Sequence, residues 1–371
     1  MKKTTIVSLI VVSVLFFSYG LLVGHYKVFP YDLLNSIKPD DNKFVTQHGS
    51  SETYGTDVDS LIHIHNESDI QIKRDAVINY VWSEKEFPSE KIPADVQKTI
   101  SDPRYADIGD LQSIDKITVS MDHDVESIAY LFHPNKSQNI LVIYHQGHDG
   151  DFIKGKDTIR FLLNKGYSVL AFSMPLLGMN NQPVIDTQFG RIKMIDHDQF
   201  QLIESSDLSP IKYFVEPVAV SLNYLDKEYD FDSYYMVGLS GGGWTTTLYS
   251  AIDPRISQSY SVAGSVPIYL RSTQENLGDY EQILPALYKN ADYLDLYILA
   301  SYGGERKHVQ IFNKYDPCCF GGLAYETYAD KIKMTLSDLG KGRFDVYLDD
   351  SHKEHKISER SLDFIYNSMK S

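Results

Sequence analysis

The sequence predicts an α/β fold, in which a mostly parallel β-sheet carries helices on both of its faces. Short runs such as 139–144 and 167–172 are almost wholly apolar, which is typical of strands buried on both sides. Segments with helical periodicity lie between such runs, and this alternation is typical of parallel sheets. The chain has 371 residues, enough for one such domain of about 250 residues and an extension.

The overall composition excludes several classes of function. The 50 acidic and 35 basic residues give a net charge of −15 with no dense run of lysine and arginine, so nucleic acid is not an expected partner. The two cysteines, Cys318 and Cys319, are adjacent and match no zinc or redox spacing. Because neighbouring Cα atoms are closer than a disulfide usually spans, we expect two buried thiols, although an oxidising compartment would permit the strained bond.

The first segment, residues 1–25, is predicted to be a signal anchor or a signal peptide. Two lysines precede an uncharged run over 4–24, which has about the length of a membrane-spanning helix. Residues 18–20 weakly resemble the cleavage site of a secretory signal. Because the apolar run continues beyond them, the sequence favours an uncleaved anchor, with the membrane as a partner. Either interpretation places the rest of the chain outside the cytoplasm, on the periplasmic or extracellular side, and cleavage would make it secreted.

Two further regions follow this segment. Residues 26–115 are predicted to form a stalk and N-terminal extension, with a short helix at 75–82 and a loop with a helical patch over 87–103. Residues 116–371 are predicted to form the main α/β domain. Its expected elements are, in order, a hairpin of strands 117–121 and 127–132, strand 139–144, a helix ending at Gly166, strand 167–172, an excursion over 175–209, helix 210–225, a strand from 233 and a helix from 241, strand 259–263, an insertion of about 265–307, strand 308–312, helix 324–339, strand 344–348 and a final helix from about 358.

A glycine-rich turn at 238–243 is the most informative motif in the chain. The sequence Gly-Leu-Ser-Gly-Gly around Ser240 matches G-x-S-x-G between a strand and a helix. In a nucleophile elbow the serine occupies a tight turn, and its small neighbours leave room for close backbone segments. A phosphate loop would need Lys-Ser or Lys-Thr after the last glycine, and Trp244 stands there; a dinucleotide fingerprint would need glycine at Thr246.

The residues after two late strands complete a resemblance to a known superfamily. Asp316 follows strand 308–312, and a histidine follows the last strand. With Ser240 in first place, this order resembles the α/β-hydrolase superfamily from about residue 117 onwards. The resemblance implies that Ser240 attacks a carbonyl carbon, a histidine takes its proton, and Asp316 orients that histidine and stabilises its cation.

Two histidines are candidates for the base. His355 opens the sequence His-Lys-Ile-Ser, which resembles the His-x-Ile-Ser that begins the last helix in many carboxylesterase-like members. His352 lies closer to the strand. We favour His355 and keep His352 as the alternative.

The resemblance also implies an oxyanion hole. The backbone N–H of Gly241, at the start of the helix, would be one donor. The turn His145-Gln146-Gly147-His148 is similar to the His-Gly-x turn after the superfamily's third strand, and this match implies the backbone N–H of His148 as the second donor, with Gly147 as the alternative. Gln146 stands where that motif often has histidine.

Together these features predict an extracytoplasmic serine hydrolase. The favoured reaction is that of a carboxylesterase or deacetylase acting on a small-molecule or polysaccharide ester, and Trp244 with the tyrosine-rich insertion could stack on sugars. A peptidase or amidase with the same triad is one alternative, and a non-catalytic binding protein on a hydrolase scaffold is another. We expect no cofactor and no metal, because the His-x-x-His pairs 145/148 and 352/355 lack the glutamate of a zinc-protease motif and fall on predicted loops.

Overall fold

The computed structural model describes residues 3–26, 29, 53–83, 86–271 and 277–370. The chain divides into two compact units, Met1–Thr46 and Gln47–Ser371. In the first unit, the predicted apolar run forms the helix α1 (Lys3–Tyr26). Counting only the side chains that the structure describes, none of the helices has both the length and the apolar character needed to cross a membrane. The membrane anchor stays a prediction from the sequence.

The second unit is built on a nine-stranded sheet. Its strands are β1 (Asp95–Ile100), β2 (Leu111–Ser120), β3 (Glu126–Pro134), β4 (Ile140–His145), β5 (Ser168–Phe172), β8 (Ser233–Leu239), β9 (Ile256–Val262), β10 (Lys307–Asn313) and β11 (Arg343–Asp349). The spatial order is β1-β2-β3-β5-β4-β8-β9-β10-β11. Three neighbouring pairs at one end of this order, β1 with β2, β2 with β3 and β3 with β5, are antiparallel. All the other pairs in the order are parallel. The predicted, mostly parallel sheet is confirmed.

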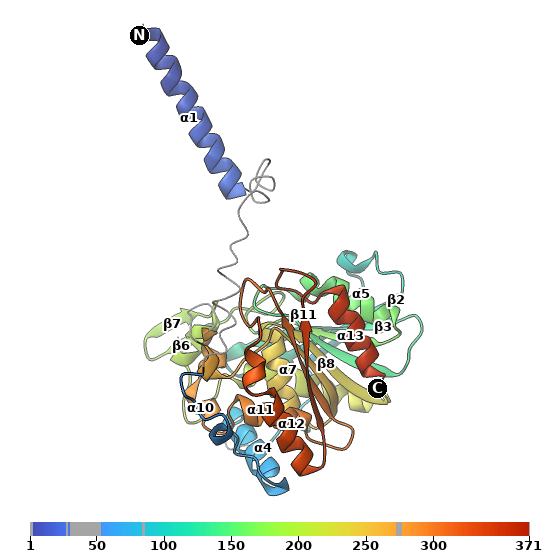
Figure 1. Ribbon diagram of the computed structural model, residues 1–371. Helices are drawn as coiled ribbons and strands as arrows, with labels where there is room; N and C mark the ends of the chain where they lie inside the picture. Colours follow the sequence, from blue (N-terminus) through green and yellow to red (C-terminus); the bar gives the residue numbers. More distant parts are fainter. Residues whose placement is uncertain (1–2, 27–28, 30–52, 84–85, 272–276, 371) are drawn as a thin grey trace. The chain divides into compact units, whose positions relative to one another are not determined.

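Helices pack on both faces of this sheet, as the sequence predicts. One face carries α5 (Lys156–Asn164) and α13 (Glu359–Met369). The other face carries α4 (Glu67–Val81), α6 (Lys212–Glu228), α7 (Gly241–Ile252), α11 (Tyr293–Ser301) and α12 (Ala329–Leu339). Figure 1 shows α5 and α13 together on one side, with α4, α7, α11 and α12 on the other. Each face therefore has its own apolar core, and this explains why the central strands are apolar on both sides.

The predicted stalk and N-terminal extension over 26–115 is not separate from the main domain in its described residues, because those from Thr53 onwards belong to the same compact unit. Its helix begins at Glu67 and not at Asp75, since the side chain of Asn66 accepts hydrogen bonds from the first turn and forms a capping box with Asp69. The predicted loop over 87–103 contains the edge strand β1, which pairs with β2. Most of the side chains of β1 are exposed, so the strand gives no apolar signal.

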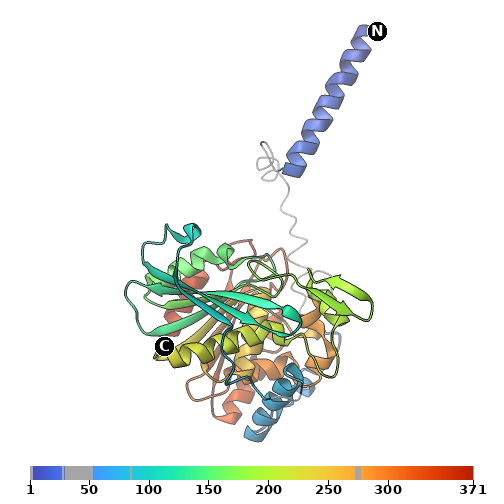
Figure 2. The ribbon, with the colours of Figure 1, turned by 180° about the vertical axis from the view of Figure 1, so that it is seen from behind.

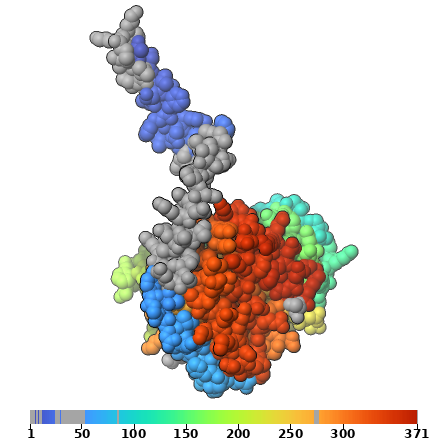
Figure 3. Space-filling view, viewed as in Figure 1, coloured from blue at the N-terminus to red at the C-terminus, as the bar shows by residue number. Residues whose placement is uncertain are grey.

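Side chains on and just after α4 attach it to the main body. Lys73 Nζ lies 3.1 Å from the carboxylate of buried Asp295 on α11. Trp82, the residue after α4, donates a hydrogen bond of 2.8 Å from its indole N–H to Glu216 on α6. Figure 3 shows the blue atoms of this region directly against the orange atoms of the C-terminal third. The N-terminal extension is therefore part of the folded domain.

Two excursions leave the parallel part of the sheet. The first, over 175–209, contains the hairpin of β6 (Val184–Thr187) and β7 (Gly190–Lys193) and the 3₁₀ helix η5 (His197–Leu202). Figure 2 shows the green hairpin standing out from the body. The second, at about 265–307, contains α9 (Tyr280–Ile283), α10 (Pro285–Tyr288) and α11. Every residue of α11 is buried, so this part of the predicted insertion is a core helix. The other short 3₁₀ helices are η1 (Asp59–Leu61), η2 (Pro103–Tyr105), η3 (Asp122–Asp124), η4 (Phe152–Gly155), η6 (Ile268–Leu270) and η7 (Ala324–Thr327).

Candidate active site

Ser240 lies at the junction of β8 and α7, in the tight turn that the G-x-S-x-G motif predicts. Its backbone has φ 56° and ψ −126°, a conformation that residues with a side chain rarely adopt. The turn holds because its neighbours are small: a Cβ on Gly242 would come within 2.1 Å of the backbone oxygen of His145. The strand β4 and the start of α7 thus approach more closely than any side chain would allow. Ser240 lines the pocket at the end of this turn.

His355 and Asp316 are brought together from two loops that lie far apart in the sequence. Nδ1 of His355 lies 2.7 Å from Oδ2 of Asp316. Burial works to raise the pKa of Asp316, but hydrogen bonds from His355, the Cys318 N–H and the Asn313 side chain outweigh it and lower the pKa below the usual value. The aspartate is therefore held as a carboxylate beside the imidazole.

A second aspartate, which the sequence analysis did not single out, shapes the loop that carries His355. Asp349 ends β11, and its carboxylate accepts hydrogen bonds from the backbone and hydroxyl of Ser351 and from the hydroxyls of Ser358 and Ser361. Burial acts to raise the pKa of Asp349, but these hydrogen bonds outweigh it and lower the pKa strongly. Asp349 therefore ties the residues just before the two histidines to those just after them. Serines clustered on both sides of the histidines are the only sequence signal for this arrangement.

The alternative base, His352, is placed elsewhere. Its Nε2 lies 3.6 Å from Oδ2 of Asp349, and its Nδ1 accepts a hydrogen bond from the Glu354 backbone. It lines a different hollow, on the side of α5 and α13. The structure thus puts His355, and not His352, beside Asp316.

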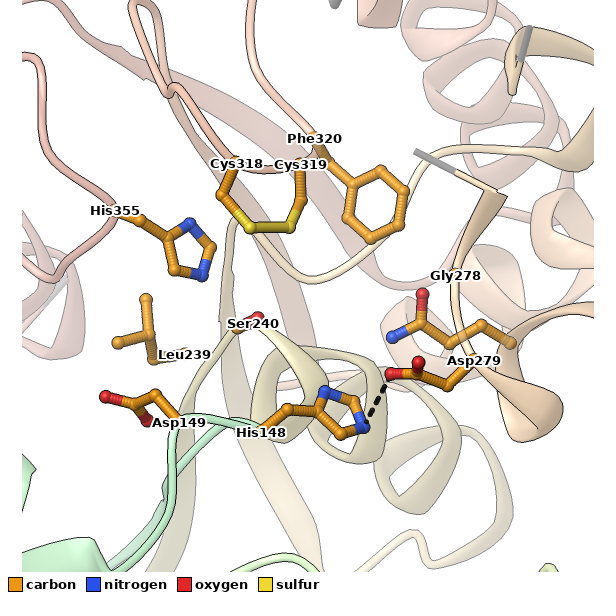
Figure 4. Close-up of a pocket in the computed structure, with 11 residues that line it drawn as sticks. His148, Asp149, Leu239, Ser240, Gly278, Asp279, Cys318, Cys319, Phe320 and His355 are labelled. Atoms are coloured by element: carbon orange, nitrogen blue, oxygen red, sulfur yellow. Dashed lines mark ion pairs between the residues drawn. A yellow bond between two sulfur atoms is a disulfide. The ribbon is translucent and has the colours of Figure 1, made fainter. Parts of the chain in front are cut away.

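A pocket of about 400 Å³ opens over Ser240. Ser240 and His355 both line it, and Figure 4 shows their side chains at its wall. Nε2 of His355 is buried and has no hydrogen-bond partner among the described residues. One nitrogen of the ring is therefore engaged by Asp316, while the other is available in the region that the serine occupies.

The predicted oxyanion residues lie beside Ser240. Gly241 is the first residue of α7, and His148 lines the pocket. Gly147 is close as well, because a Cβ placed on it would lie 2.7 Å from Cβ of Ser240. The turn after β4 and the start of α7 therefore flank the serine from two sides, as two converging N–H donors require.

The comparisons with known proteins concern the fold alone. No protein-family model matches this sequence, and no curated protein matches it. A solved acetyl xylan esterase from Paenibacillus sp. R4 matches with a TM-score of 0.56 and 13% identity, over 84% of this chain and 98% of that one. A glucuronoyl esterase from Solibacter usitatus matches with 0.53 and 14%, over 80% and 91%. Acetyl xylan esterase 1 from a Thermoanaerobacterium species matches with 0.52 and 12%, over 88% and 97%. The chain therefore shares its fold with these solved esterases.

Cys318 and Cys319 form one wall of the pocket. Their sulfur atoms are bonded to each other, so the expectation of two free thiols is wrong. The Cys318 N–H donates a hydrogen bond of 2.8 Å to Asp316. Figure 4 shows the disulfide beside His355 and Phe320. The acid loop therefore presents a sulfur and aromatic surface to the pocket.

Trp244 does not face the pocket. Its side chain is buried, packs edge-on against Phe214 and donates a hydrogen bond of 2.8 Å to the hydroxyl of Tyr288. Tyr288 in turn stacks on Tyr293. The idea that Trp244 stacks on a sugar is therefore wrong, because the indole is part of the core beneath α7.

In the described part of the chain, three groups of side chains are compact enough to hold a metal ion. The first consists of Cys318, Cys319 and His355, but its sulfurs are taken up by the disulfide. The second joins His63 to Asp292 and Asp295, and the ammonium group of Lys73 already lies against Asp295. The third group consists of His148, His197 and Glu281.

Proposed function

We propose that the chain is a serine hydrolase that cleaves ester bonds through Ser240, His355 and Asp316. One observation carries the proposal. The ring of His355 uses one nitrogen to contact Asp316 at 2.7 Å, while its other nitrogen is unpartnered among the described residues, in the pocket that Ser240 lines. This is the relation that a nucleophile, a base and an orienting acid require.

The chemistry follows from these positions. Ser240 Oγ attacks the ester carbonyl carbon while Nε2 of His355 takes its proton, and Asp316 stabilises the imidazolium. The backbone N–H groups of Gly241 and His148 face the oxygen that becomes negative. The alcohol leaves with the proton from His355, and water then attacks the acyl-enzyme by the same route and releases the acid.

The substrate class is an ester with a small acyl group, on a small molecule or a polysaccharide. The fold neighbours include two acetyl xylan esterases and a glucuronoyl esterase, and this supports a carbohydrate ester. The pocket is about 400 Å³ in volume and has Asp149 and Asp279 in its wall. Each of these carboxylates is paired, Asp149 with Lys154 and Asp279 with His148. Deacetylation is the reaction that agrees with the fold neighbours and with the size of the pocket.

The catalytic unit works outside the cytoplasm, attached to the membrane by its N-terminal segment or released from it by cleavage. The lysines ahead of the apolar run and the disulfide of Cys318 and Cys319 support this location, because disulfides persist in oxidising compartments. In intact cells, the catalytic unit should be digested by an added protease that leaves a cytoplasmic marker intact. Protection equal to that of the marker would contradict this location.

Labelling of the serine tests the proposal. The full-length protein is treated with a fluorophosphonate probe, and the modified residue is located by mass spectrometry. We expect the label on Ser240, with none in Ser240→Ala and at least about 100-fold slower labelling in His355→Ala. His352→Ala is the matched control, because His352 lies in the same loop but lines another hollow, and it should label at the normal rate.

Each alternative predicts a different result. A folded protein that does not react with the probe is a binding protein on a hydrolase scaffold. Slow labelling in His352→Ala with normal labelling in His355→Ala would make His352 the base. Labelling at Ser240 followed by turnover of amides in preference to acetyl esters would make the protein an amidase or peptidase.

A further inference from the structure

Beside the pocket, the side chains of Asp279, Glu281 and His197 converge on the imidazole of His148. Nε2 of His148 lies 3.0 Å from Oδ2 of Asp279, 3.0 Å from Oε1 of Glu281 and 3.1 Å from Nδ1 of His197. Figure 4 shows the contact between His148 and Asp279. His197 and Glu281 are almost completely buried. The candidate mechanism uses the backbone of His148, and it gives no role to these side chains.

Hydrogen bonds alone do not satisfy this cluster. Nε2 of His197 lies 2.8 Å from the backbone oxygen of Pro175, which only accepts, so this nitrogen carries a hydrogen. Nε2 of His148, with at most one hydrogen, faces three polar atoms, two of which are carboxylate oxygens. Oε2 of Glu281 is fully buried, has no hydrogen-bond partner among the described residues, and lies 3.6 Å from Nδ1 of His197.

We propose that this cluster is a binding site for one divalent ion of the zinc class, with His148 Nε2, His197 Nδ1, Glu281 and Asp279 as its ligands. Bonds of about 2.0–2.2 Å in a tetrahedral site hold ligand atoms about 3.3–3.6 Å apart. The separations of 3.0, 3.1 and 3.6 Å among His148, His197 and Glu281 are close to these values, and these three residues form the compact group. Asp279 lies 3.0 Å from Nε2 of His148 but is not part of that group, so its half-exposed carboxylate must rotate toward the ion to complete a tetrahedral site.

The donor set selects the class of ion. Two imidazoles with two carboxylates suit zinc and its transition-metal neighbours, whereas calcium and magnesium prefer oxygen alone. The charge of the ion balances the two carboxylates, one of which is fully buried. The Pro175 carbonyl fixes the ring of His197, as an outer partner of a metal-binding histidine does.

The site joins three segments that are far apart in the sequence. His148 lies in the turn after β4, His197 at the start of η5, and Asp279 and Glu281 at α9. Four protein ligands leave no open position, so the ion has a structural role. It fixes the turn whose backbone N–H groups flank Ser240, and it fastens both excursions to that turn.

This inference departs from the sequence prediction of no metal. Only His148 of the pair 145/148 takes part, because Nδ1 of His145 is bonded to the backbone oxygen of Gln146. The other three ligands come from segments that share no motif with it.

Metal titration tests the site without any measurement of activity. Full-length protein that carries no affinity tag is stripped of metal by dialysis against a chelator, with the cysteines kept oxidised, and is titrated with Zn²⁺ in a calorimeter. We expect one ion bound per chain and a rise in Tm. Replacement by Co²⁺ should give the visible absorption of a tetrahedral site.

Variants locate the ion. Glu281→Gln and His197→Gln should each weaken Zn²⁺ binding at least about tenfold. His63→Gln is the matched control, because it alters the other intact group, His63 with Asp292 and Asp295, and it should bind Zn²⁺ as the wild type does. Folded wild-type protein with neither bound Zn²⁺ nor a change in Tm would overturn the proposal. So would unchanged binding in both ligand variants, or loss of binding in His63→Gln.

Discussion

Gly147 sets the distance between the turn after β4 and the nucleophile elbow. A Cβ at this position would lie 2.7 Å from Cβ of Ser240 and 2.8 Å from the backbone oxygen of Leu239. Both contacts are too short for real atoms, and one of them is to rigid backbone. The position therefore requires glycine because of the close approach.

We expect Gly147→Ala to lower kcat/KM for an acetyl ester on the order of 100-fold, because the added methyl displaces Ser240 from its partners. The measurement is steady-state kinetics together with a thermal melt. Gly109→Ala is the control, since nothing lies within 4 Å of a Cβ there, and it should keep normal kinetics. Equal kinetics in the two variants would show that the elbow tolerates the methyl group.

Much of the candidate site can be predicted from single residues. Ser240, Asp316 and His355 each follow a recognisable strand, so local pattern and chain order are enough to propose them. The choice against His352 depends on how Asp349 and its serines close the loop, which is a tertiary property. The acids around His148 are invisible to motif analysis because they lie more than a hundred residues from it.

Arg306 connects the ends of two neighbouring helices. Its guanidinium donates hydrogen bonds to the backbone oxygens of Ser250 near the end of α7, Leu299 and Tyr302 near the end of α11, and Ile256 at the start of β9. Carbonyl groups at helix C-termini lack partners within the helix and carry partial negative charge. Burial lowers the pKa of Arg306 to about 9, so it stays charged at neutral pH.

We expect Arg306→Met to lower the free energy of unfolding by about 3 kcal/mol or more, because several buried carbonyl groups lose their donor at once. Urea unfolding measures the change. Arg306→Lys should retain part of the stability, since lysine keeps the charge but has fewer donors. Arg191→Met, at an exposed position, should change stability by less than about 0.5 kcal/mol. Similar losses in Arg306→Met and Arg191→Met would contradict this role.

The elements that the sequence predicts well are those with strong apolar patterns. The parallel strands are recognised because both of their faces are buried. The exposed strand β1 and the first two turns of α4 were missed, since their stability comes from pairing with β2 and from the cap at Asn66. The order of the strands was not predictable, because β4 pairs with β8 across a long stretch of chain.

At the scale of the whole molecule, the described residues include two fully buried histidines outside the proposed chemistry, His145 and His308. Burial lowers the pKa of His145 to about 4 from 6.5. Burial, followed by the charge of Arg306, lowers that of His308 to about 3. Between pH 6.5 and these values, the unfolded chain binds protons that the folded chain does not. The contribution to stability from each is therefore complete above pH 6.5 and is lost as the pH falls, by up to about 1.4 kcal/mol per pH unit.

The contribution of His308 to the pH dependence of stability can be measured by comparing the wild type with His308→Gln. His308→Gln should lose less stability than the wild type when the pH is lowered from 7 to 4, even if it is less stable at pH 7. The reason is that glutamine binds no proton in either state. The measurement is urea unfolding at several pH values, and parallel pH profiles for the two proteins would refute the prediction.

The edge strand β1 has a consequence for the behaviour of the protein at high concentration. Its register with β2 shifts between Gln97 and Ile100, and Thr99 has a positive φ of 56°. A strand from a second molecule needs a straight, regular row of backbone groups to pair with. The bulge interrupts that row, and Lys98 adds an exposed charge. This end of the sheet thus resists edge-to-edge aggregation, the commonest hazard of a large open sheet.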